Sequence, residues 1–81
     1  MKARVFVSLK STVLDPQGQT VRSALNGLGY HGIADVRQGK FFEIALTEGI
    51  TRDQAQHDID TIAHEVLANP VIEEYRVELL D

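Results

Sequence analysis

The chain has 81 residues, of which 43% are hydrophobic and 25% charged, as in folded domains rather than disordered segments. That length suits a single domain, residues 1–81, with a small core, because a chain of this size buries only about 60–65% of its unfolded surface. The 12 acidic and 8 basic residues give a net charge of -4 without any basic run, which argues against nucleic acid or an anionic membrane as a partner. Cysteine is absent, which excludes disulfides, thiolate metal sites and a cysteine nucleophile.

The chain also carries no recognisable targeting or membrane signal. Its first residues lack the long apolar segment of a signal peptide. No apolar run approaches the roughly 20 residues needed to cross a bilayer. A cytoplasmic location is therefore expected.

The first predicted element is a strand over residues 3–9. Ala3, Val5, Val7 and Leu9 alternate with more polar residues, and this period of two is typical of a half-buried strand. Phe6 is the exception, because its parity places it on the outward face.

A helix is predicted to begin at Asp15-Pro16. Asp is a favoured N-cap, since its carboxylate accepts hydrogen bonds from first-turn N–H groups, and Pro suits the first helical position. Gly29 fits the left-handed residue that commonly ends a helix. Four apolar residues recur at i, i+3, i+4 and i+7 and predict one buried helix face: Val21, Ala24, Leu25 and Leu28.

Residues 33–47 alternate again and predict strand structure interrupted by Gly39. The inward residues share one parity: Ala34, Val36, Phe42, Ile44 and Leu46. A hairpin with an odd loop over residues 37–39, with Gly39 in the left-handed position, keeps that parity. One long strand kinked at Gly39 keeps it as well, so both arrangements remain open.

A second helix is predicted from Thr51, where Thr51 and Gln54 form a capping-box pattern. Asn69-Pro70 ends this helix, because Pro cannot continue it. The predicted buried stripe of the helix consists of Ala55, Ile59, Ile62, Ala63, Val66 and Leu67.

A terminal strand follows, in which Val71, Tyr75, Val77 and Leu79 share one parity. The resulting order is β-α-β(β)-α-β. It predicts a ferredoxin-like α+β fold with an antiparallel sheet and both helices on one face.

The sequence contains no set of residues that could catalyse a reaction or bind a metal. His57 and His64 lie about 10 Å apart along their helix, too far to share one ion. Glu73 and Glu74 are neighbours on a strand and point to opposite faces, so they cannot share a proton. Asp15 would occupy the anion-binding end of its own helix, and no phosphate-binding motif accompanies it. We therefore expect no catalytic residues, no metal and no bound cofactor in this chain, which is not an enzyme by itself.

The outward face of the predicted sheet is more apolar than a free surface usually is. Phe6 and Phe41 lie on it, together with Ile33 and Ile72. A contiguous apolar patch marks an interface, so this face is predicted to contact another protein chain.

Three motifs in a fixed order are similar to the PurS family. They are Leu9-Lys10 with Val13 to Gly18, then Val36-Arg37-Gln38-Gly39-Lys40, then Leu67-Ala68-Asn69-Pro70-Val71-Ile72-Glu73. Each motif alone is weak, and the set is specific and spans nearly the whole chain. PurS is the small subunit of phosphoribosylformylglycinamidine (FGAM) synthase in purine biosynthesis.

The resemblance implies an accessory role in a complex that uses ATP, Mg and glutamine. In that family a glutaminase subunit releases ammonia and a large synthetase subunit consumes it. The small subunit bridges the two, supports ammonia transfer and forms dimers or tetramers through its strands. The alternative reading is a regulatory ligand-binding module of the ACT type, which shares the ferredoxin-like pattern.

Seven residues are predicted to contact partners or other copies of the chain. Arg37, Gly39 and Lys40 form the most distinctive segment, and Arg is favoured at interfaces because it binds carbonyls or carboxylates bidentately. Asn69 and Pro70 match the third motif, although a helix stop alone could explain them. Phe6 and Phe41 complete the set.

Overall fold

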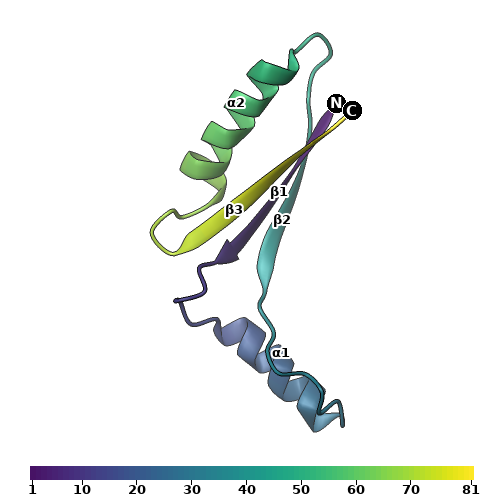
Figure 1. Cartoon of the computed structure of the whole chain (residues 1–81), viewed down its shortest axis with the longest axis vertical. Coiled ribbons are helices and arrows are strands. Elements are labelled where there is room, and N and C mark those ends of the chain that lie inside the picture. Colours follow the sequence, from purple (N-terminus) through teal and green to yellow (C-terminus); the bar gives the residue numbers. More distant parts are fainter.

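A computed structural model describes all residues 1–81 as three strands and two helices in the order β-α-β-α-β (Figure 1). The central strand is β1 (Lys2–Leu9), which pairs antiparallel with β2 (Gly39–Ala45) on one side and β3 (Glu73–Leu80) on the other. Lys2 pairs with Leu80, so the two chain termini lie together at one end of the sheet. The predicted α+β class and antiparallel sheet are confirmed.

The core lies between β1 and the helix α2 (Arg52–Ile62). Ala3, Val5 and Val7 are fully buried, as the alternation predicted, and Ile59 from α2 packs against them. The core is small, since only 9 of the 81 residues are buried. Most of the molecule therefore remains available for contacts with other chains.

The two ends of α2 differ from each other. At its start, the Thr51 hydroxyl accepts the Gln54 N–H at 3.1 Å, so the predicted cap is confirmed, although the Gln54 side chain donates to Asp58 instead of returning to Thr51. At its end, the chain widens into a π-helical turn, η1 (Ala63–Leu67). The wider turn changes the helical phase, which explains why Val66, predicted to be buried, is 73% exposed.

The other helix, α1 (Pro16–Gly27), begins and ends as predicted. The Asp15 carboxylate accepts the Gly18 N–H at 2.9 Å, and Gly29 has a left-handed φ of 101° just beyond the helix. However, α1 projects beyond the end of the sheet, away from α2 (Figure 1). Its predicted apolar face is uncovered, and Leu28 is 75% exposed. The expectation that both helices cover one face of the sheet is therefore wrong for the single chain.

Gly39 does not form a hairpin turn. It is the first residue of β2, pairs with Ser8 and does not have a positive φ. Residues 33–38 precede it without strand pairing and run directly into β2 (Figure 1). The hairpin alternative is wrong, and of the long strand only the part from Gly39 onward is paired. Gly39 is needed for space, because a Cβ there would overlap the Val7 carbonyl oxygen.

Candidate functional site

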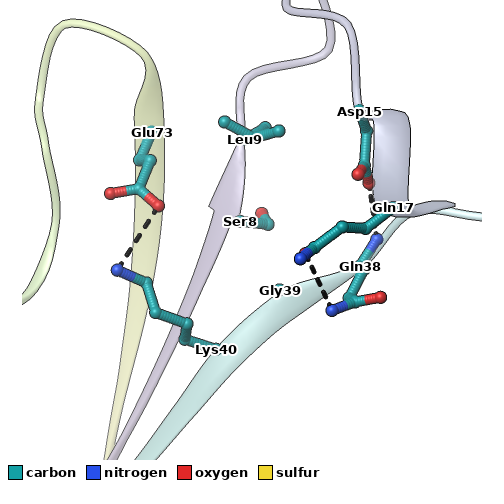
Figure 2. A pocket seen from close by; sticks show the side chains of 8 residues that line it. All are labelled: Ser8, Leu9, Asp15, Gln17, Gln38, Gly39, Lys40 and Glu73. Atoms are coloured by element: carbon teal, nitrogen blue, oxygen red, sulfur yellow. Dashed lines mark hydrogen bonds and ion pairs between the residues drawn. The ribbon is translucent and has the colours of Figure 1, made fainter.

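The three sequence motifs meet at one place, the end of the sheet next to α1. We call this place the junction (Figure 2). It surrounds an open, polar pocket of about 250 Å³. The pocket is lined by Ser8, Leu9, Asp15, Gln17, Gln38, Gly39, Lys40 and Glu73. Segments that are far apart in the sequence are thus combined into one structural unit.

Asp15 connects α1 to the segment that enters β2. One of its carboxylate oxygens accepts the Gly18 N–H at 2.9 Å, and the other accepts the Gln38 N–H at 2.7 Å. The residue is only 4% exposed. The hydrogen bonds from Gln38 and then Gly18, helped by the nearby Arg37 charge, hold the pKa of Asp15 below its ordinary value of 3.8. Asp15 is therefore an ionised acceptor that fixes two backbone segments.

We predict that Asp15→Asn removes an acid-sensitive part of the stability. Because the folded-state pKa is depressed, the stabilisation is present above pH 3.8 and is lost as the pH falls through the folded-state pKa. Urea unfolding near neutral pH should show the wild type more stable than the variant, and the difference should shrink as the pH falls below 3.8. A difference that stays constant down to acid pH would show that the Asp15 charge has no part in it.

Arg37 binds the connection between β1 and α1. Its Nη2 donates to the carbonyl oxygens of Lys10 and Val13, each at 3.0 Å. Close by, Gly18 lies so near the Val36 carbonyl oxygen that a Cβ at this position would overlap it. The side chain predicted to reach a partner thus has intramolecular acceptors, and residues 36–38 are fastened to residues 10–18.

Lys40 and Glu73 join β2 to the start of β3 across the pocket. The Lys40 Nζ lies 3.6 Å from a Glu73 carboxylate oxygen, and the other Glu73 oxygen accepts the Asn69 N–H at 2.7 Å. The Asn69 side chain accepts the Val71 N–H at 3.1 Å and so stabilises the turn before β3. Pro70 is exposed in this turn. The predicted residues Lys40, Asn69 and Pro70 therefore belong to one connected region.

Phe6 and Phe41 lie on the other face of the sheet, away from α2. Their rings are 5.1 Å apart between centroids, and the Arg76 guanidinium lies 4.3 Å from the centre of the Phe6 ring. Phe41 is 53% exposed. On the same face, Lys2 and then Arg4 lower the pKa of Glu43 by hydrogen bonds and charge. The predicted residues thus form two groups, the junction and an outward aromatic cluster of Phe6, Phe41 and Arg76.

Sequence reasoning did not identify how several residues of these groups contact one another. Gln38 donates from its backbone N–H to Asp15 and from its side-chain amide to Gln17, and neither hydrogen bond has a sequence signature. Arg76 could be placed beside Phe6 only once the strand order was known. Asp15 had a readable signal as a helix cap, but its second bond spans 23 positions in the sequence.

The polar groups of the junction mainly hold one another. Asp15, Arg37 and Glu73 all have hydrogen-bond partners within the chain. No group of three or more His, Cys, Asp or Glu side chains is placed to hold a metal ion. None of the helices has both the length and the apolar character needed to span a membrane. What the junction can do is fix the position of α1 relative to the sheet.

These features define the class of protein as a small α+β assembly domain, with a three-stranded sheet and a helix left uncovered. A family model described as PurS, phosphoribosylformylglycinamidine (FGAM) synthase, matches residues 2–81. The chain belongs to the PurS family.

Individual relatives agree with this assignment. The chain is 42% identical over 82 residues to the Bacillus subtilis phosphoribosylformylglycinamidine synthase subunit PurS, covering 96% of this chain and 90% of the relative. The structure of Methanocaldococcus jannaschii PurS is similar with a TM-score of 0.83 and 34% identity, over 95% of this chain and 92% of that one. A chain of the Thermotoga maritima PurLQS structure is similar with a TM-score of 0.86 and 30% identity, over 98% and 95%. The alternative of an ACT-type ligand-binding module finds no support.

Proposed function

We propose that this chain is the small accessory subunit of an FGAM synthase and that it acts by holding the larger subunits together. One observation carries this proposal: the chain buries only 9 of its 81 residues and leaves large apolar side chains such as Leu28 and Phe41 exposed. The ionisable groups agree with a role outside catalysis, because the pKa values of Asp15 and Glu43 are both shifted downward. A general acid or base that works near neutral pH needs a pKa moved toward 7. At neutral pH these two groups instead act as ionised acceptors in structural contacts.

The partners are a glutaminase subunit, which releases ammonia, and a large synthetase subunit, which uses it. A similar chain occurs in the Thermotoga maritima PurLQS structure, which supports this choice of partners. Ammonia released into water is diluted and largely protonated, so docking the two active sites together raises its effective concentration at the second site. ATP, Mg and glutamine are used by the larger subunits, and the complex works in the cytoplasm.

Reconstitution of the complex with and without this chain tests the proposal. With glutamine as nitrogen source, omission of the chain should lower product formation by about tenfold or more. With concentrated ammonium salt the loss should be much smaller, because transfer between active sites is bypassed. Equal glutamine-dependent product formation with and without the chain would refute the bridging role.

The shape of the single chain supports self-association as part of this function. Its radius of gyration is 16.2 Å, whereas a compact chain of this length has about 12 Å. Its accessible surface is 5716 Å², against about 4,900 Å² for a compact protein of this mass. The excess is close to the roughly 800 Å² that each partner buries in a standard interface. We propose that a second copy covers this surface.

The parts of the chain that are left uncovered could pair with one another between two copies. Residues 16–38, which we call the arm, carry the exposed apolar face of α1 and an unpaired extended segment. The sheet offers a free edge at β2, beside Phe42 and Ile44, which are only partly buried. Antiparallel pairing of residues 33–38 with β2 of a second copy, about an axis near Gly39, would bring Val36 opposite Phe42. That pairing would also bring α1 onto the face already covered by α2 in the second copy.

The outward aromatic cluster is the proposed contact for the larger subunits. It lies on the face opposite to α2, so a partner docked there does not compete with the arm. Aromatic residues and Arg are enriched in the energetically dominant parts of interfaces.

A further inference from the structure

We propose that the junction is a lock that keeps the arm from folding back onto its own sheet, so that the arm can dock only on a second copy. This inference rests on the self-association proposed above. It gives the family motifs a single physical role, which is to decide between closure within one chain and exchange between two chains.

A lock is needed because two arrangements compete: the arm can close on its own sheet, or it can dock on the sheet of a second copy. The sequence alternation would also be satisfied by a closed chain, with a turn near Gly39 and α1 packed on its own sheet. A tethered segment has an effective concentration on the order of 1 mM for its own binding site. At micromolar protein concentrations closure would therefore outcompete exchange by about 100-fold or more, unless the structure prevents it.

Gly39 provides the first part of the lock. A hairpin at this position would need a left-handed residue in the turn, but Gly39 does not have a positive φ and continues β2 opposite Ser8. Its missing Cβ lets the strand pass directly over the Val7 carbonyl. The chain leaves the sheet straight, in the direction of the arm, instead of reversing.

The base of the arm provides the second part. In a closed chain Val36 would lie beside Phe42 on the edge of the sheet. In the structure Val36 is instead held against Gly18, while Arg37 binds the carbonyls of Lys10 and Val13. The Gln38 N–H also donates a hydrogen bond to the Asp15 carboxylate at 2.7 Å. Closure would have to break all of these contacts at once, because they hold residues 36–38 beyond the end of the sheet.

The test is to open the lock by adding chain length and removing the Arg37 contacts. A flexible insert of six Gly and Ser residues between Gln38 and Gly39, combined with Arg37→Ala, should allow the arm to reach its own sheet. By sedimentation equilibrium the wild type should be a dimer of the 9.0 kDa chain. The variant should dissociate at least 100-fold more readily and give a monomer that unfolds cooperatively, with the amides of α1 still protected from hydrogen exchange.

The matched control places the same insert in the exposed turn after Gly49, which has a left-handed φ of 87° and no atoms near its Cβ position. This control variant should remain a dimer. The proposed lock is refuted if the variant with the insert before Gly39 and Arg37→Ala stays as dimeric as the control. It is also refuted if the monomer of that variant leaves the amides of α1 unprotected from hydrogen exchange. A monomeric wild type would instead refute the proposed dimer, so the two failures are distinguishable.

Discussion

Replacing Gly18 with alanine is expected to lower the free energy of unfolding by about 1–3 kcal/mol, the usual cost of forcing extra atoms into a packed site. The added Cβ would overlap the Val36 carbonyl oxygen, which belongs to the backbone and cannot rotate away. The helix α1 must then move relative to residues 36–38. We therefore also expect weaker self-association, measured by sedimentation, together with the loss of stability in urea unfolding.

Gly27→Ala is the matched control, because Gly27 lies in the same helix and nothing is within 4 Å of its Cβ position. There the only change is the better helix propensity of alanine, which should stabilise the chain by about 0.5–1 kcal/mol. The two substitutions are chemically identical and are expected to have opposite signs. Equal effects would mean that the close approach of Gly18 to Val36 has no energetic importance.

Ile59→Ala is expected to cost about 2–5 kcal/mol, the range found when large aliphatic side chains are removed from a core. Ile59 is 1% exposed and is the largest fully buried side chain, packed against the central strand. A domain of this length has a total stability of only about 4–12 kcal/mol, so the variant is expected to be partly unfolded at 37 °C. Thermal unfolding followed by circular dichroism, at a fixed protein concentration, measures the effect.

Val71→Ala removes aliphatic carbon from a side chain that is 78% exposed and serves as the control. Its effect should stay within about 0.5 kcal/mol. If Ile59→Ala were as mild as this control, the contact between α2 and β1 would not be the main core of the chain. Addition of the larger subunits should partly restore the stability of the Ile59→Ala variant, because partners that bind only the folded chain stabilise it.

A small core and a bridging function are physically compatible. With only 9 buried residues, the chain uses most of its apolar side chains on surfaces rather than on its own interior. Leu28 and Phe41 illustrate this, since both are exposed, Leu28 at the end of α1 and Phe41 on the strand β2. Stability and assembly are then linked, because each contact with another chain also stabilises this one.

Local signals in the sequence were sufficient to predict most of the helices and strands. The Asp15 and Thr51 caps, the left-handed Gly29 and the alternation of β1 all depend on residues within a few positions of one another, and the structure confirms them. The prediction that Val66 is buried was wrong, because the π-helical turn changed the helical phase. Nothing in the local sequence pattern indicates that change. The start of β3 also fell two residues later than predicted, after the Asn69 turn.

The sequence by itself determined the class of fold, the family and the residue types of the candidate site, because caps, periodicity and ordered motifs are local properties of the chain. Only the tertiary structure decided where those residues lie: that Gly39 continues a strand, that Arg37 binds carbonyls of its own chain, and that α1 stands away from the sheet. Periodicity says which face of an element is apolar but not what covers that face. That choice depends on contacts between distant segments, here the bonds of Asp15 and Arg37 that hold the arm outward.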